Sequence, residues 1–415
     1  MDDDASEWVD APPTPVPASG AWRPGDHPGE RRFLDIGDLP LEADPLGELP
    51  DVTIAYETWG ELNEARDNAI YVSHALSGDS HAYGHAGPGH LTGGWWNSLI
   101  GPGRPLDPTR HFIVSANIVG GCQGTTGPAH PHPTDGHPWG SRFPWLTLRD
   151  MVAAEVRLTD ALGIDAWMLM LGPSMGGMRA LEWAATYPTR VRSIAAIGTT
   201  AATTAEQIAW GAAQTAAIRA DARFAGGDFY TAADGEGPHV GLGIARMIAH
   251  TTYRSEPELQ ERFGRSAQPA DPRSADGAPA GDVLLGPGVE GTGPYSVESY
   301  LEHHAEKLAR RFDANTYLRI VHAINTHDVG RGRGGIGEAL ARFTGPALVA
   351  AVDSDRLYPL SHSRELADAL PGCEGVDLLH SDVGHDGFLV ESEALNSLVE
   401  ALLSRVGHVS DGVRN

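Results

Sequence analysis

The chain is poor in cysteine, in lysine and in long apolar runs, and each shortage excludes a class of protein. Two cysteines, Cys122 and Cys373, cannot build a disulfide framework, so a reducing cytoplasm is the simplest location. Lys307 is the single lysine among 30 basic residues, and 55 acidic residues set the net charge at −25. This charge disfavours nucleic acid and anionic membranes as partners. No apolar run reaches the ~20 residues of a membrane-spanning helix. The N-terminus lacks a signal-peptide pattern.

Short apolar segments alternate with helix-like segments along most of the 415 residues. The segments with strand character are 52–60, 69–78, 111–121, 166–172, 190–200, 347–355 and 376–388. Apolar strands that alternate with helices predict a parallel sheet with helices on both faces. The alternation stops in the middle of the chain, where the helix-like segments are 205–220, 241–250, 296–312 and 314–325.

This pattern predicts an α/β domain that carries an inserted helical block. Residues 33–200 and 341–408 would form the α/β core, and residues 201–340 the helical insertion. Residues 1–32 are rich in proline, aspartate and glycine, so we expect a disordered arm there. The Pro/Gly/Ala/Asp-rich segment 267–294 predicts a mobile loop within the insertion.

A serine stands between glycines directly after a buried apolar segment. Residues 172–176, GPSMG, match the G-x-S-x-G motif, which is the nucleophile elbow of α/β-hydrolase folds. The apolar segment before Ser174 and the helix-like segment after it are the context that the motif requires. Glycines flank the serine because the turn packs backbone against backbone, where a Cβ would clash. We therefore predict an α/β-hydrolase fold with Ser174 as its nucleophile.

A serine nucleophile needs a base and an orienting carboxylate, which follow it in this fold in the order Ser, Asp/Glu, His. Asp353 and Asp355 follow one apolar segment, and His385 follows the last one. The carboxyl ends of parallel strands meet at one edge of a sheet, so these side chains are expected near Ser174. Either aspartate fits this order.

Two backbone amides are candidates for stabilising the negative charge that develops on the substrate oxygen. The Met175 amide lies at the head of the helix after the nucleophile, and the Leu76 amide lies in the loop after an early strand. One such donor contributes roughly 3–4 kcal/mol to lowering the barrier.

Beyond the elbow, the chain resembles the homoserine O-acetyltransferases of methionine biosynthesis from about residue 33 to residue 405. The segments that carry the resemblance, in order, are SHALSGDSHAYG, GGWWNSLIGPGRPLDPTRHFIVSANIVGGCQGTTGP, FPWLTLRDMV, GPSMGGMRALEWA, FDANTYLRIVHAINTHDVGRGRGG, SDRLYPL and GHDGFLVE. The resemblance implies an α/β-hydrolase core with a helical lid, a homodimer, and acetyl transfer from acetyl-CoA to the hydroxyl of L-homoserine. Acetyl-CoA would be a co-substrate, and no other cofactor is implied.

The family's functional residues can be carried over through these motifs. Ser174 is then the nucleophile, His385 the base, and Asp355, rather than Asp353, the acid. The substrate-binding residues implied are Arg246, Tyr253 and Asp386. The sequence departs from the family pattern at Pro173, at the histidine-rich segment 129–139 and at the apparent insertion 267–294.

Several further residues have a structural interpretation beside the functional one. His130, His132, Asp135 and His137 could suggest a metal, but we interpret this proline-rich loop as a solvated decoration and predict no metal. Arg331 and Arg333 could bind the phosphates of CoA or brace the lid. We expect Cys122 to be small and buried, and Trp95 and Trp96 to belong to the core or a tunnel wall.

Four alternatives to an acetyl-CoA:homoserine transferase stay open. The acyl donor could be succinyl-CoA, or the acceptor serine. More distant possibilities are an esterase and a non-catalytic protein with this fold.

Overall fold

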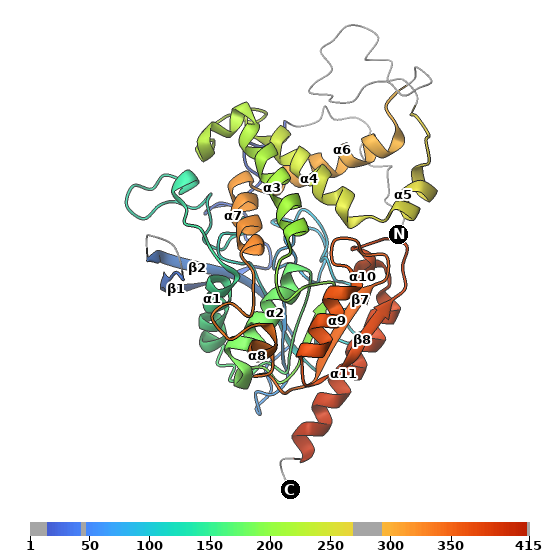
Figure 1. Cartoon of the computed structure of the whole chain (residues 1–415). Helices are drawn as coiled ribbons and strands as arrows, with labels where there is room; N and C mark the ends of the chain where they lie inside the picture. The colour runs from blue at the N-terminus through green and yellow to red at the C-terminus, as the bar shows by residue number, and fades with distance from the viewer. Residues whose placement is uncertain (1–14, 43–46, 269–292, 413–415) are drawn as a thin grey trace.

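A single eight-stranded sheet organises the chain (Figure 1). The computed structural model describes residues 15–42, 47–268 and 293–412. The strands lie in the order β1-β2-β4-β3-β5-β6-β7-β8. Their bounds are β1 Arg32–Pro40, β2 Glu48–Trp59, β3 Ala69–Val72, β4 Phe112–Ala116, β5 Leu169–Pro173, β6 Ile194–Ile197, β7 Ala347–Val352 and β8 Cys373–Leu379.

The sheet is antiparallel only at one edge, where β2 pairs with β1 and β4. The strands from β4 through β3, β5, β6 and β7 to β8 are all parallel. The carboxyl ends of the parallel strands therefore meet at the same edge of the sheet, as predicted. Within the central parallel strands, alternate residues enter two separate cores. Met170 of β5, for example, faces one core, whereas Leu169 and Leu171 face the other.

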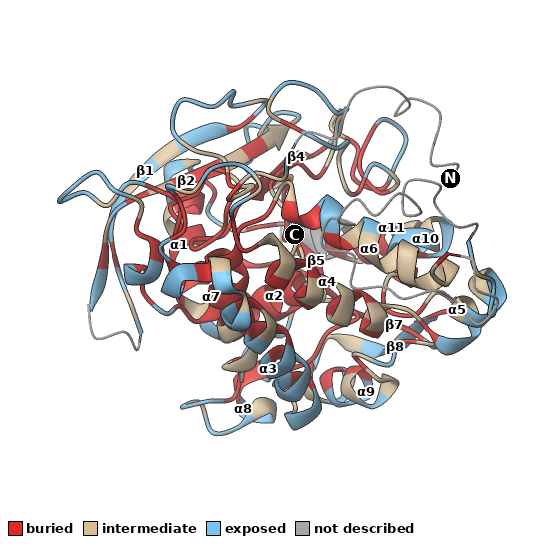
Figure 2. Cartoon of the chain, turned by 90° about the horizontal axis from the view of Figure 1, so that it is seen from above, coloured by how far each residue is buried: buried red, intermediate tan, exposed pale blue. Residues whose placement is uncertain are grey.

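Helices cover both faces of the sheet, which confirms the predicted fold class. Helices α1 (Leu148–Ala161), α2 (Met175–Thr186) and α9 (Leu360–Ala369) contribute to one core. The long helix α11 (Ser392–Gly412) contributes Leu395 and Val399 to the other. Viewed from above, the buried strands lie beneath helices whose outer turns are exposed (Figure 2).

The segment of the chain that connects β6 to β7 forms a block of helices, which lies above the carboxyl ends of the strands (Figure 1). Its members are α3 Ala205–Ala220, α4 His239–Tyr253, α5 Glu256–Phe263, α6 Ser296–Ala309 and α7 Ala314–Asn325. Helix α4 packs against α3 and α6. The proposed lid matches this block except at its end. Helix α8 (Ile336–Leu340) packs against α2 and α9 of the core, so the boundary at residue 340 is too late.

The prediction of a disordered arm over residues 1–32 is wrong for the part that the structure describes. The Gly20 amide donates to the Phe312 carbonyl at 3.0 Å, and the Trp22 amide donates to the Cys122 carbonyl at 2.9 Å. A Cβ at Gly20 would lie 2.6 Å from the Arg311 backbone nitrogen, so the glycine permits this close approach. Proline and glycine here lie in an irregular segment with turns, which these hydrogen bonds hold against the core.

The predicted mobile loop 267–294 falls, apart from its ends, outside the described residues. None of the helices that the structure describes combines the length and apolar character needed to cross a membrane.

Candidate active site

Ser174 occupies a strained turn between β5 and α2. Its backbone has φ 54° and ψ −123°, a conformation that residues other than glycine rarely adopt. A Cβ at Gly172 would lie 2.5 Å from the Gly176 backbone, and one at Gly176 would lie 2.2 Å from the Ser73 carbonyl oxygen. These contacts explain why glycines flank the serine. The turn leaves the Ser174 side chain half-buried at the carboxyl edge of the sheet.

Asp355 and His385 form a buried pair at the same edge. The His385 Nδ1 atom lies 2.7 Å from Asp355 Oδ2. The other carboxylate oxygen accepts hydrogen bonds from the backbone amides of Leu357 and Tyr358, at 2.8 and 2.9 Å. Asp355 is thus held on both oxygens. Because Nδ1 donates to Asp355, the Nε2 atom of His385 is the nitrogen available to accept a proton.

The other candidate carboxylate lies elsewhere. Asp353 Oδ2 lies 2.8 Å from Nδ1 of His380, whose side chain is exposed. The structure therefore pairs His385 with Asp355 and not with Asp353.

Opposing effects act on the charge of His385. Burial favours the neutral imidazole, but the adjacent Asp355 carboxylate outweighs it, so the pKa of His385 is raised above its ordinary value. The ring is enclosed by Tyr358 and Phe388, at centroid distances of 5.1 and 5.6 Å. A Cβ at Gly198 would lie 3.4 Å from the ring. This close-packed environment fixes the orientation of the base.

Tyr358 is a site residue that sequence reasoning missed. Burial raises the pKa of its hydroxyl, and an interaction with the Ser174 side chain opposes part of that rise. Its position three residues after Asp355, in the SDRLYP motif, is the signal that could have found it.

The two predicted oxyanion donors lie beside the nucleophile turn. Met175 begins α2, and Leu76 lies in the loop after β3, whose Ser73 carbonyl contacts the turn glycines. Among the described residues, no hydrogen-bond acceptor is assigned to either amide. Both N–H groups are thus available to a ligand oxygen.

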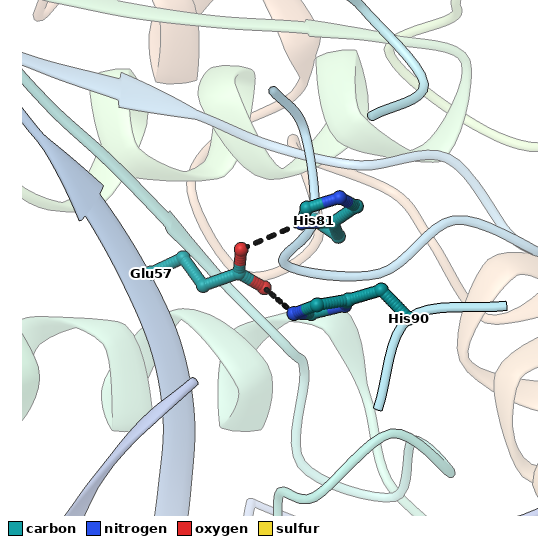
Figure 3. A group of neighbouring side chains, drawn as sticks. All are labelled: Glu57, His81 and His90. Carbon is teal, nitrogen blue, oxygen red and sulfur yellow. Dashed lines mark hydrogen bonds and ion pairs between the residues drawn. The ribbon is translucent and has the colours of Figure 1, made fainter. Parts of the chain in front are cut away.

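A buried polar cluster anchors the loop that carries Leu76 (Figure 3). The carboxylate of Glu57, on β2, accepts a hydrogen bond from the Ser80 hydroxyl at 2.7 Å and lies 2.8 Å from His81 Nδ1. His81 Nε2 lies 3.1 Å from the His85 carbonyl oxygen. Both ring nitrogens of His81 therefore face acceptors. The His90 ring stacks on His81 with centroids 3.8 Å apart.

The same cluster could hold a metal ion by its geometry. The ligand atoms of Glu57, His81 and His90 lie within 4.8 Å of one another. Hydrogen bonds already engage these atoms. Burial lowers the pKa of His81, but the Glu57 carboxylate outweighs that effect and raises it, as expected of an imidazolium that donates from both nitrogens. His90 Nε2 accepts from the Glu30 amide at 2.9 Å. The chemistry of this set fits a charged pair that fastens the loop better than a metal centre.

The histidine-rich loop is only partly the solvent-exposed loop that the sequence predicted. His130 is buried, and burial lowers its pKa to about 4, whereas Asp135 and His137 are exposed. Asp135 forms an ion pair with Arg142 at 2.6 Å. Within the part of the chain that the structure describes, the ligand atoms of this loop do not come together as a set of three.

The predicted substrate-binding residues lie over the base. The Tyr253 ring lies 5.6 Å from the His385 ring, and the Arg246 guanidinium lies 5.5 Å from the Tyr253 ring. The buried Nε atom of Arg246 has no hydrogen-bond partner among the described residues. Asp386 lies 3.6 Å from Arg254, a residue that sequence reasoning missed.

Arg331 and Arg333 are engaged in ion pairs within the protein. Arg331 lies 2.8 Å from Glu42, and Arg333 contacts both carboxylate oxygens of Glu182 on α2. Their geometry favours the bracing interpretation over the phosphate one. Trp96 and Cys122 are buried, and the Trp95 ring stacks on Trp96 at 4.9 Å, as expected for the core.

Comparison with known proteins supports the fold and identifies the family. Residues 69–392 match the family model of the alpha/beta hydrolase fold. The homoserine O-acetyltransferase of Thermobifida fusca (strain YX) is 53% identical over 392 residues, which cover 94% of this chain and 98% of that protein. The chain belongs to the homoserine O-acetyltransferase family.

Other members and solved structures are similar over the same length. The homoserine O-acetyltransferase of Leifsonia xyli subsp. xyli is 50% identical, covering 94% of this chain and 93% of that protein. The crystal structure of homoserine O-acetyltransferase from Bacillus anthracis superposes with a TM-score of 0.77 at 24% identity, covering 90% and 97% of the two chains. Esterase E22 superposes with a TM-score of 0.75 at 25% identity, covering 90% and 99%. Membership of this family makes the chain an acyltransferase.

Proposed function

We propose that the chain transfers the acetyl group of acetyl-CoA to the hydroxyl of L-homoserine, as a step of methionine biosynthesis in the cytoplasm. The observation that carries this proposal is 53% identity to a homoserine O-acetyltransferase over 94% of the chain. The buried Asp355–His385 pair beside the strained Ser174 turn supports it. The reaction needs no cofactor or metal besides acetyl-CoA as co-substrate.

The first half-reaction would acylate Ser174. His385 takes the hydroxyl proton while Ser174 Oγ attacks the thioester carbonyl, and the oxyanion accepts hydrogen bonds from the Leu76 and Met175 amides. The carbon–sulfur bond then breaks, and the proton on His385 passes to the thiolate, so that free CoA leaves. Asp355 stabilises the imidazolium throughout without taking its proton.

The second half-reaction would return the serine. Homoserine enters, His385 takes the proton of its hydroxyl, and that oxygen attacks the acyl-serine carbonyl. Ser174 leaves and recovers a proton from His385. Water could follow the same course, so the lid helices must exclude it while the acceptor is held.

Thiol release provides the test of this function. Acetyl-CoA and succinyl-CoA are each supplied with homoserine, with serine and with no acceptor. We expect sustained thiol release over many turnovers, with ester formation, only with acetyl-CoA and homoserine; acetyl-CoA alone should release at most about one thiol per chain, as Ser174 is acylated. Equal release without an acceptor would instead identify an esterase, the alternative that the similarity to esterase E22 makes specific. No release with any donor would refute acyl transfer.

Arg246 is proposed to bind the carboxylate of homoserine, while Asp386 accepts from its ammonium group and Tyr253 lines the pocket. The buried Nε atom of Arg246 is a donor that has no acceptor among the described residues, as expected where a ligand carboxylate completes the site. Arg254 lies 3.6 Å from Asp386, so the ammonium group of homoserine would share this carboxylate with a guanidinium group.

Arg246→Ala should spare acyl-enzyme formation and slow acyl transfer to homoserine. Loss of a charge-assisted pair costs roughly 2–5 kcal/mol. Single-turnover kinetics, with thiol release and ester formation followed separately, measure the two halves. Arg219→Ala, on the exposed face of α3, is the matched control. If Arg246→Ala slows both halves equally, the arginine supports the lid or CoA and not the amino acid.

The homodimer implied by the family is proposed to form through the lid. Ile208 and Trp210 of α3 are about 40% and 41% exposed, which leaves apolar surface for a second copy. Light scattering should give about twice the 44.0 kDa mass of one chain. A monomer at micromolar concentration would contradict this proposal.

A further inference from the structure

A second cavity lies in the lid, between α5 and α6, outside the site described above. Its volume is about 270 Å³. The lining combines aromatic rings, a guanidinium and a hydroxyl, and its main members are Arg262, Phe263, Ser299, Tyr300, His303 and His304. None of these residues takes part in the proposed mechanism.

A continuous row of rings connects this cavity to the base. The His385 ring lies 5.6 Å from Tyr253, and Tyr253 lies 6.1 Å from His250 of the same lid helix. His250 in turn lies 5.3 Å from Tyr300 and 4.1 Å from His304, both of which line the cavity. Three ring contacts thus separate the cavity from the reacting atoms. The extended pantetheine arm of CoA bridges such a separation.

The cavity is locally basic in a strongly acidic protein. Arg262 lies over the Tyr300 ring at 4.6 Å and near the Phe263 ring at 5.1 Å. Glu258 lies 3.7 Å from both Arg254 and Arg262, so one carboxylate faces two guanidinium groups. Asp386 also lies 3.6 Å from Arg254, so these two guanidinium groups share two carboxylates. Among the described residues that line the cavity itself, Arg262 carries a positive charge and none is a carboxylate, so the lining favours an anion.

His250, which is buried, and His304, which is half-buried, lie close to the same positive charge. Burial lowers the pKa of His250 to about 2, and the Arg246 guanidinium adds to that effect. Burial and Arg246 likewise lower the pKa of His304 to about 3. Both rings are neutral at pH 7, so they add aromatic surface without competing for an anionic ligand.

We propose that this cavity binds the phosphorylated adenosine end of CoA, an inference that rests on the proposed function. The Tyr300 and Phe263 rings provide faces on which a purine stacks, and Arg262 provides a planar donor for phosphate oxygens. The Ser299 hydroxyl adds a hydrogen-bonding group. The nucleotide would be held in the lid while the pantetheine arm follows the row of rings to Ser174.

Two acetyl donors test this assignment. Acetyl-CoA carries the nucleotide, whereas S-acetyl-N-acetylcysteamine carries the same thioester without it. Arg262→Ala and Tyr300→Ala should each raise the KM for acetyl-CoA by roughly tenfold to a hundredfold, the range expected from loss of one stacking or phosphate contact. Their kcat/KM for the truncated donor should equal that of the wild type. Tyr300→Phe retains the ring and should retain the low KM.

Arg265→Ala is the matched control, because Arg265 belongs to the same part of the lid and is exposed. Equal losses with both donors would overturn the proposal, since they would indicate a lid that is merely deformed. Unchanged KM values for acetyl-CoA would overturn it as well.

Direct binding separates this proposal from the proposed function. Adenosine 3′,5′-bisphosphate, titrated calorimetrically into the whole protein, should bind the wild type and bind Arg262→Ala at least tenfold more weakly. This readout does not require turnover. If the nucleotide binds but acetyl-CoA releases no thiol, the proposed function fails and the cavity assignment stands. If the nucleotide does not bind, the assignment is wrong.

Discussion

Replacing Ser174 with alanine is expected to lower kcat by roughly 10⁶-fold, the loss seen when a serine triad loses its nucleophile. The Ser174 turn has backbone angles that only a structural constraint maintains, and the buried Asp355–His385 pair lies at the same edge of the sheet. Alanine keeps the Cβ and removes only Oγ, so the turn itself should persist. The loss would therefore reflect chemistry rather than folding.

Mass spectrometry of the protein incubated with acetyl-CoA alone measures the intermediate directly. One acetyl group should appear on the peptide that contains Ser174, and none on the same peptide of Ser174→Ala. Ser361→Ala, an exposed serine at the start of α9, should be acetylated at Ser174 and turn over like the wild type. An unmodified wild-type peptide, or continued turnover by Ser174→Ala, would refute the acyl-serine mechanism.

The central elements of the α/β core could be predicted because each is encoded in a short stretch of sequence. The central parallel strands β3, β5, β6 and β7 are short apolar runs that are buried along their whole length, so that composition alone marks them. The elbow is similarly explicit, since a nucleophile between two close-packed backbones requires glycines at fixed spacing. The predicted residues 205–220 and 314–325 coincide with α3 and α7.

Interactions between distant segments could not be predicted. Arg254 meets Asp386 across more than a hundred residues, and Glu57 meets His81 across 24 residues that include strand β3. Nothing in the neighbourhood of either residue marks its partner. The prediction of a disordered N-terminal segment was wrong for the same reason. Its order comes from backbone contacts with Cys122 and Phe312 rather than from its own composition.

Arg331 and Arg333 illustrate a third limit. Both side chains lie in a glycine-rich loop, and the sequence left them equally suited to CoA phosphates or to a structural brace. The structure shows Glu42 and Glu182 beside them. Arginine binds carboxylate and phosphate with the same geometry, so only the location of the acidic partner distinguishes the two interpretations.

Asp355→Asn should lower kcat by roughly 10⁴-fold, whereas Asp353→Asn should have a much smaller effect. Asp355 holds Nδ1 of His385 at 2.7 Å through one oxygen, and backbone amides fix its other oxygen. An asparagine there can present its amide group to Nδ1 and so favour the wrong tautomer, which leaves no free nitrogen to accept the Ser174 proton. Asp353 instead meets exposed His380.

The pH dependence of acyl-enzyme formation provides a second readout of the same variant. His385 must be neutral to act as a base, and Asp355 raises its pKa above the ordinary value of about 6.5. Wild-type activity should therefore fall as pH decreases through a midpoint above 6.5. In Asp355→Asn no carboxylate opposes the effect of burial on His385, so the midpoint should move to lower pH.

Profiles of kcat/KM for the wild type, Asp355→Asn and Asp353→Asn measure this shift. An equal loss of rate in both variants, or a midpoint unchanged in Asp355→Asn, would show that Asp355 is not the residue that orients the base.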